Sequence, residues 1–194
     1  MIKAAIFDAD DTLIDSLRVW READEEYLKM KGKTFDSAIF EKFKKMTYAQ
    51  CLSYVKKHFD FDETEEQISD GIMEIVMKKY ENEVKPVDGI EEVLKRLLDN
   101  GIKMAVATSN DRRLISRALR NTGLRSYFSL VVTCDETGYG KSDAGVYVKT
   151  AEMLGVEPSE TLVVEDDRSY VAAAKEKGFI AIHVSDIRRF GFGK

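Results

Sequence analysis

Cysteine and histidine are scarce in this chain, with two of each among 194 residues. Cys51 and Cys134 lie far apart and match neither a metal-ligand spacing nor a redox motif, so we expect two reduced, buried thiols. His58 and His183 each stand alone, and we expect both to be structural or solvated rather than catalytic. The sequence therefore gives no sign of a cysteine-based metal site or redox centre.

Long apolar stretches and basic clusters are also missing. No apolar run approaches the length of a membrane span, and the first residues have the pattern of a core strand rather than that of a signal peptide. The formal net charge is −5, and no block of basic residues offers a surface for nucleic acid. We therefore expect a cytoplasmic, globular protein that binds neither membranes nor nucleic acid.

What the chain does contain is an alternation of short apolar runs with helical patterns. The apolar runs span 2–7, 102–107, 130–133, 162–164 and 181–184. Strands that alternate with helices at this spacing favour a parallel sheet covered on both faces. We predict an α/β fold with a Rossmann-like three-layer α/β/α core, in which the carboxyl ends of the strands share one edge. Asp88 and Glu91 have the spacing of a capping box at the start of one helix.

Residues 16–84 have a different character, because they contain no convincing strand. Apolar residues such as Val19 and Ala23 recur there at helical spacing, between highly charged outer faces. We therefore predict an inserted, all-helical second domain over 16–84, carried by a core of residues 1–15 and 85–194.

Polar side chains gather where the apolar runs end. They are Asp8, Asp10 and Thr12 after the first run, Thr108, Ser109 and Asn110 after the second, Lys141 beyond the third, and Glu165, Asp166 and Asp167 after the fourth. In a parallel sheet these positions converge on one crevice. Acidic side chains that share a small space repel one another and a phosphate unless a divalent cation offsets them. With Mg²⁺ bound, the acids become its ligands, while the lysine and the helix N-termini can hold phosphate oxygens.

This ordered set resembles the four motifs of the haloacid dehalogenase (HAD) superfamily, specifically its phosphatases and beta-phosphoglucomutase-like members. The motifs are Asp8-Ala9-Asp10-Asp11-Thr12, Thr108, Lys141 and Glu165-Asp166, each after an apolar run. The resemblance covers about residues 1–15 and 85–194, and it implies that the inserted helices form a cap. It also implies a hydrolase of phosphate monoesters that works through an aspartyl-phosphate.

The resemblance implies catalytic roles for three residues. Asp8 would be the nucleophile that attacks phosphorus. Asp10 would be the general acid that protonates the leaving oxygen, and then the base that activates water. Lys141 would balance the charge of Asp8 and of the equatorial phosphoryl oxygens.

The resemblance also implies a Mg²⁺ site. The ion would bind the Asp8 carboxylate, the Asp10 backbone carbonyl and Asp166, with waters completing the octahedron. Glu165 would be either a direct ligand or an outer partner of the metal, and we lean to a contribution at the metal.

The resemblance implies that the residues after the second apolar run bind the phosphate. Thr108 would donate its hydroxyl to the phosphoryl group, helped by the backbone N–H groups of Ser109 and Asn110. Thr108 can at the same time cap the helix that follows.

Three positions depart from the family's pattern. Asp11 stands where the family usually has glycine; aspartate tolerates unusual backbone angles, but here it adds a negative charge near the phosphate. The family often has prolines and an aspartate soon after the lysine, whereas this chain reads Ser142-Asp143-Ala144-Gly145, and Tyr170 replaces an early glycine in the last helix. These departures leave open a different class of protein, a binding or regulatory member that kept the metal site and lost turnover.

The nearest alternative enzyme in the superfamily is a sugar phosphomutase. Such relatives carry a histidine where this chain has Trp20 and a cap-loop arginine where it has Tyr48, and both absences favour hydrolysis. We expect a small phosphorylated metabolite as substrate, a sugar phosphate or a similar ester, and a monomer or weak homodimer. The cap residues expected to contact the distal end of the substrate are Arg18, Arg21, Lys44, Lys45 and Tyr48.

Overall fold

The computed structural model describes residues 1–43, 46 and 48–189, so Lys44 and Lys45, named above as candidate substrate contacts, lie outside the described residues. The chain forms two compact units, Met1–Ser16 with Val84–Lys194, and Leu17–Glu83. Among the described residues, no helix combines the length and the hydropathy that a bilayer span requires.

The first unit is built on a five-stranded parallel sheet with the order β3-β2-β1-β4-β5. The strands are β1 (Ala4–Phe7), β2 (Lys103–Thr108), β3 (Leu130–Thr133), β4 (Thr161–Glu165) and β5 (Ile180–His183). All five predicted strands are present. The central strands are buried along almost their whole length, which explains why their sequences are continuous apolar runs rather than alternating patterns.

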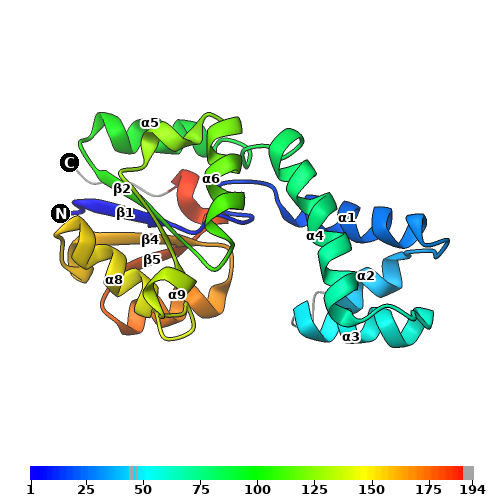
Figure 1. The fold of residues 1–194 in the computed structure, drawn as a ribbon. Helices are drawn as coiled ribbons and strands as arrows, with labels where there is room; N and C mark the ends of the chain where they lie inside the picture. The colour runs from blue at the N-terminus through cyan, green and yellow to red at the C-terminus, as the bar shows by residue number, and fades with distance from the viewer. Residues whose placement is uncertain (44–45, 47, 190–194) are drawn as a thin grey trace. The chain divides into compact units, whose positions relative to one another are not determined.

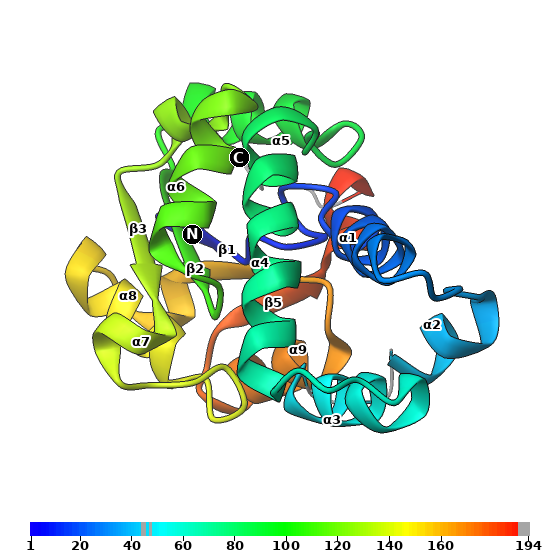
Figure 2. The same cartoon turned by 45° about the vertical axis from the view of Figure 1, so that its right-hand side comes forward.

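Helices cover both faces of this sheet, so the predicted three-layer α/β/α core is confirmed. The α-helices of the unit are α5 (Ile90–Asp99), α6 (Arg112–Asn121), α7 (Cys134–Thr137), α8 (Gly145–Leu154) and α9 (Arg168–Glu176), with short 3₁₀ helices η1 (Leu124–Tyr127), η2 (Pro158–Glu160) and η3 (Val184–Arg189). Helices α5 and α6 lie on one side of the sheet, and α8 and α9 lie on the other (Figures 1 and 2).

The start of α5 differs from the sequence prediction. The helix begins at Ile90, and Gly89 occupies the N-cap position with a φ of 74° and no side-chain hydrogen bond. Asp88 is therefore one residue too early to cap the first turn, and the predicted capping box with Glu91 is wrong. The left-handed turn at Gly89 replaces the side-chain cap, because glycine adopts this conformation without steric cost.

The chain leaves and re-enters the first unit at two adjacent segments that are hydrogen-bonded to each other. The Asp15 N–H donates to the carbonyl of Lys85, and the Val87 N–H donates to the carbonyl of Leu13, both at 2.9 Å. These bonds fix the backbone just after the first motif.

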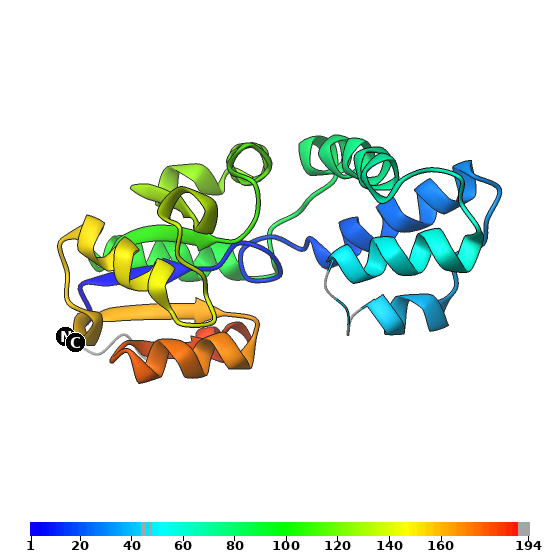
Figure 3. The same cartoon turned by 60° about the horizontal axis from the view of Figure 1, so that its bottom comes forward.

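Within its described residues, the second unit contains four helices, which Figure 3 shows side-on. They are α1 (Leu17–Met30), α2 (Ser37–Phe43), α3 (Tyr48–Phe59) and α4 (Glu65–Asn82). A capping box between Thr64 and Gln67 starts α4. The Tyr27 ring of α1 packs so closely on α4 that a Cβ at Gly71 would overlap it. We call Leu17–Glu83 the helical unit.

The cysteines and histidines have structural surroundings. Cys51 and Cys134 are free thiols, but both are half-buried rather than buried as predicted. The His58 ring stacks on Tyr54 with centroids 4.9 Å apart. The Nδ1 atom of His183 lies 2.8 Å from a neighbouring serine hydroxyl.

Candidate active site

The loop after β1 carries the first motif. The Asp8 N–H donates to the carbonyl of Val164 in β4 at 3.0 Å, and the Asp8 side chain is buried. The N–H groups of Leu13 and Ile14 both donate to the carbonyl of Ala9, at 2.9 and 3.1 Å, and close the loop into a tight turn. Asp8 is thus held at the carboxyl edge of the sheet.

Asp11 has a backbone conformation that favours glycine, the residue that the resemblance leads one to expect at this position. Its φ is 55°, in the left-handed region that aspartate tolerates better than most residues. Its side chain also has a partner, because Oδ1 accepts the Ser16 N–H at 3.1 Å. Asp11 therefore forms the turn and supports the segment that leads into α1.

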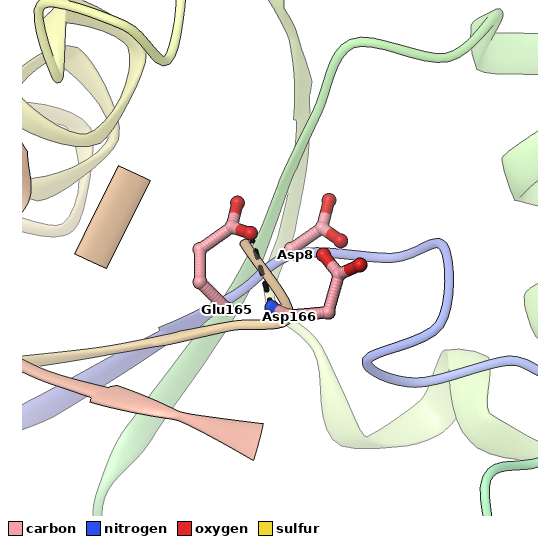
Figure 4. A group of neighbouring side chains, drawn as sticks. All are labelled: Asp8, Glu165 and Asp166. Atoms are coloured by element: carbon pink, nitrogen blue, oxygen red, sulfur yellow. Dashed lines mark hydrogen bonds between the residues drawn. The ribbon is translucent and has the colours of Figure 1, made fainter. Parts of the chain in front are cut away.

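Three carboxylates meet at the strand ends. Glu165 is the last residue of β4 and is fully buried, and Asp166 follows it. One carboxylate oxygen from each of Asp8, Glu165 and Asp166 lies within 4.8 Å of the others. Figure 4 shows the three side chains extending into the same space beyond β4 and the loop after β1.

Lys141 reaches these acids from the loop before α8. Its Nζ donates to Asp8 Oδ1 and, at 2.7 Å, to Glu165 Oε1, and the side chain is buried. The loop turns sharply behind it, because Ala144 has a φ of 58° and donates its N–H to the Lys141 carbonyl at 3.0 Å. The lysine is therefore oriented without the prolines that this loop lacks.

Tyr147 of α8 is part of the same network, although it is not among the site residues predicted from the sequence. Its hydroxyl donates to Glu165 Oε1 at 2.5 Å. Glu165 Oε2 accepts the N–H groups of Asp166 and Asp167, at 3.1 and 3.3 Å. Glu165 thus accepts four hydrogen bonds from protein groups. A tyrosine on the buried face of a helix needs a partner for its hydroxyl, and that requirement is the signal that could have identified Tyr147.

The segment after β2 lies next to the first motif. Asn110 donates from Nδ2 to Asp10 Oδ2 at 3.0 Å, and its N–H donates to Thr108 Oγ1 at 3.0 Å. Thr108 is fully buried and Ser109 is exposed. The helix α6 is capped by Asp111 and not by Thr108, so the predicted capping role of Thr108 is wrong.

Burial and charge act in opposite directions on this cluster. Burial raises the pKa of the Asp8 carboxyl well above its ordinary value of 3.8, and Glu165 and Asp10 raise it further, while Lys141 opposes the shift. Burial by itself would lower the pKa of the Lys141 ammonium, but the Asp8 and Glu165 carboxylates raise it above its ordinary value. Burial and Glu165 raise the pKa of Asp166 to about 6.

The residues at this edge fit a hard divalent cation. Carboxylate oxygens of Asp8, Glu165 and Asp166 lie close together there, and carboxylate oxygen is the ligand type that Mg²⁺ prefers. The single ammonium of Lys141 contacts two of the three acids. The raised pKa values of Asp8 and Asp166 are the response expected of acids that lack sufficient positive charge nearby. A bound cation would supply that charge.

Comparison with known proteins identifies the family. The sequence profile of haloacid dehalogenase-like hydrolases matches residues 5–184. The chain belongs to this family. The predictions of the HAD superfamily and of a hydrolase are therefore confirmed.

Curated relatives match nearly the whole HAD chain. A phosphorylated carbohydrates phosphatase of Thermotoga maritima is 28% identical over 182 residues, which cover 94% of this chain and 84% of the relative. A phosphoglycolate phosphatase of Neisseria meningitidis is 27% identical over 197 residues, which cover 99% of this chain and 82% of the relative. Among solved structures, a candidate beta-phosphoglucomutase of Thermotoga maritima aligns with a TM-score of 0.85 at 25% identity, covering 97% of both chains.

Proposed function

We propose that this HAD hydrolase is a Mg²⁺-dependent phosphatase that hydrolyses a small phosphate monoester, such as a sugar phosphate, through an aspartyl-phosphate on Asp8. The observation that carries the proposal is the contact of the Lys141 ammonium with Asp8, beside Glu165 and Asp166 at the strand ends. The phosphatase names of the curated relatives support it. We propose the helical unit as the cap.

In the first step, the Asp8 carboxylate attacks phosphorus and the bond from phosphorus to the ester oxygen breaks. Asp10 gives its proton to the leaving oxygen, so the alcohol departs neutral. Lys141 and Thr108 hold the equatorial phosphoryl oxygens, helped by the N–H groups of Ser109 and Asn110. The Asn110 side chain positions the Asp10 carboxyl through their hydrogen bond.

In the second step, Asp10 takes a proton from water as the water attacks the phosphorus of the aspartyl-phosphate. Inorganic phosphate leaves and the Asp8 carboxylate is restored. Asp8 and Asp166, together with the backbone carbonyl of Asp10, would hold Mg²⁺. When bound, the ion would neutralise charge around the phosphoryl group. We propose Glu165 as an outer partner that orients Lys141, because its four hydrogen bonds already occupy its oxygens.

Hydrolysis is favoured over phosphomutase chemistry by the residues at two positions of the helical unit, Trp20 and Tyr48. Trp20 stands where mutases carry a histidine, and its indole N–H donates to the Tyr80 hydroxyl at 3.1 Å. An indole donates but cannot take up a proton, so it does not replace an acid–base histidine. A mutase would isomerise a hexose phosphate in the presence of a bisphosphate activator, and we expect no such activity.

The proposed function is tested with an aryl phosphate as a generic substrate. We expect turnover with Mg²⁺, a loss of at least about 100-fold with EDTA, and recovery when Mg²⁺ is restored. The absence of hydrolysis across a broad panel of phosphate esters, with folded protein and Mg²⁺, would favour the binding or regulatory alternative.

Asp166→Asn tests the metal ligands. Asn is a weaker ligand than a carboxylate, so the Mg²⁺ concentration for half-maximal activity is expected to rise at least about tenfold. Asp167→Asn is the matched control, because Asp167 caps α9 through the Ser169 N–H and is exposed. It should lower stability slightly and leave the Mg²⁺ requirement unchanged. Equal Mg²⁺ requirements in both variants would refute the assignment of Asp166.

Tyr147→Phe removes only the hydroxyl that holds Glu165. We expect kcat to fall about tenfold with little change in KM, because Lys141 is less well positioned in the transition state while substrate binding is retained. Tyr127→Phe is the control. It removes a hydroxyl that donates a solvent-exposed hydrogen bond to Glu91 Oε1 at 3.4 Å. A change confined to thermal stability, with kcat intact, would show that Tyr147 is structural only.

Asp11→Asn removes a negative charge and keeps a side chain that accepts the Ser16 N–H and tolerates positive φ. Because Asp11 adds to the repulsion felt by Asp166, we expect KM for the anionic substrate to fall about threefold. The effect should shrink at high salt, where charges are screened. A KM that is unchanged at low salt would mean that the charge of Asp11 does not reach the substrate.

A further inference from the structure

The helical unit contains a pocket of about 130 Å³ whose ligand the catalytic steps above leave unspecified. Helices α1 to α4 all contribute to it. The described lining residues are Leu17, Trp20, Arg21, Asp24, Phe40, Phe43, Tyr48, Cys51, Leu52, Val55 and Ile72. Most of them are apolar or aromatic, and one is an acid.

Asp24 is that acid, and it lacks a partner of opposite charge. Within the described part of the chain, the structure shows neither a hydrogen bond nor an ion pair to its carboxylate. Burial raises its pKa from 3.8 to about 7. Two other acids of α1 are paired: Glu22 lies 2.6 Å from Arg18 and 3.5 Å from Lys79, and Glu26 lies 3.4 Å from Lys79.

An unpaired carboxylate in an apolar pocket lowers the stability of the fold. Desolvation of the charged form is unfavourable, and nothing in the described lining compensates it. The folded-state pKa of Asp24 is raised, so the loss of stability is complete above about pH 7 and disappears as the pH falls towards 3.8. A ligand that carries a positive charge into the pocket would remove this loss.

The aromatic walls of the pocket suit such a ligand. The Trp20 and Tyr48 rings meet edge to face with centroids 5.9 Å apart. The polar tips of both rings have partners, since Trp20 donates to Tyr80 and the Tyr48 hydroxyl lies 3.1 Å from Ser69 Oγ. Both side chains line the pocket, and aromatic rings attract cations.

Arg21 does not fill this role. It carries the only positive charge among the described lining residues. Its side chain is exposed, and its guanidinium lies 4.9 Å from the centre of the Phe40 ring. It makes no ion pair with Asp24, so the half-buried carboxylate of the pocket has no positive partner among the described lining residues.

We propose that this pocket binds the ammonium group of a small organic amine, with Asp24 as its counter-ion and the aromatic rings as its walls. The lining includes Arg21 and Tyr48, which are named above as expected contacts of the distal end of the substrate. The amine would therefore be part of the substrate, and in this respect the proposal rests on the proposed function. The binding experiment needs no turnover, so a failure of the amine site and a failure of the phosphatase are distinguishable.

The test uses the full chain labelled with ¹⁵N, with the indole N–H of Trp20 as reporter. Trp20 is the only tryptophan of the chain, and it lines the pocket. Ethylammonium and ethanol have the same number of nonhydrogen atoms and differ in charge. At pH 8 we expect ethylammonium to shift the Trp20 signal with a Kd on the order of 1 mM or weaker, as its size allows. Ethanol is expected to bind at least about tenfold more weakly.

Asp24→Asn and Glu25→Gln are the matched variants. Both remove one negative charge from α1, but Glu25 is exposed and lies outside the described lining. Asp24→Asn should weaken ethylammonium binding at least about tenfold and leave ethanol unaffected. Glu25→Gln should bind as the parent protein does. Equal behaviour of the two variants, or of the two ligands, would overturn the proposal.

The pH dependence in the unaltered protein gives an independent measurement. Ethylammonium affinity should rise about tenfold from pH 6 to pH 8, as Asp24 loses its proton. The other titratable groups of the lining keep their charge in this range, because burial raises the pKa of Cys51 to about 11 and that of Tyr48 above its ordinary 10. Arg21 is charged throughout, and α2 and α4 contribute only apolar residues to the described lining. A flat profile would contradict the role of Asp24.

Discussion

Asp8→Asn is expected to lower kcat/KM for an aryl phosphate by at least about 10⁴-fold, the largest effect of any single substitution in this protein. An amide cannot form the acyl-phosphate bond, so the displacement loses its nucleophile while the shape of the side chain is kept. Steady-state kinetics at saturating Mg²⁺ measure the loss.

The control for this result is Asp135→Asn, which makes the same change at an exposed position of α7. It should retain the activity of the parent protein. If folded Asp8→Asn retained more than about one hundredth of the parent rate, covalent catalysis by Asp8 would be excluded.

Lys141→Met is expected to have the second-largest effect, and it acts on both activity and stability. Methionine keeps the length of the side chain but leaves the buried carboxylates of Asp8 and Glu165 without their ammonium partner. Removing one partner of a buried ion pair costs about 3–5 kcal/mol of stability. The loss of transition-state charge balance should lower kcat by about 10²–10³-fold.

The stability of this variant should depend on pH with a predictable sign. Asp8 has a pKa raised above 3.8 in the folded protein, so its charged form destabilises the fold most at high pH. The deficit of Lys141→Met should therefore be largest at pH 8 and should shrink as the pH falls towards 3.8. Urea unfolding at several pH values measures it. Lys149→Met, at an exposed lysine of α8 that pairs with Glu152, is the control and should be near neutral. A pH-independent deficit would argue against an electrostatic cause.

The features that the sequence predicted well are those set by local pattern. Continuous apolar runs located all five strands, because a strand buried on both faces needs apolar residues throughout. The position of Asp8, Glu165 and Asp166 at the ends of those runs then placed them at one edge of the sheet. The left-handed turn at Asp11 also followed from residue type, because aspartate adopts a positive φ more readily than most residues other than glycine.

The features that the sequence did not reveal depend on contacts between distant segments. Tyr147 resembles any apolar helix residue until α8 packs beside β4 and brings its hydroxyl to Glu165. Asp24 resembles any charged residue of a solvated helix until the fold places it in the lining of a pocket with aromatic side chains of α2 and α3. The cap of α5 was misread because Gly89 and Asp88 are both plausible first residues, and only backbone geometry distinguishes them.

The central claim is that Asp8 carries the phosphoryl group during turnover. Acid quenching of the enzyme during turnover with Mg²⁺, followed by borohydride reduction, converts an aspartyl-phosphate into homoserine, which peptide mass spectrometry can locate. The account predicts homoserine at position 8, dependent on both substrate and Mg²⁺. Turnover without homoserine at position 8, or with the modification at another aspartate, would contradict it.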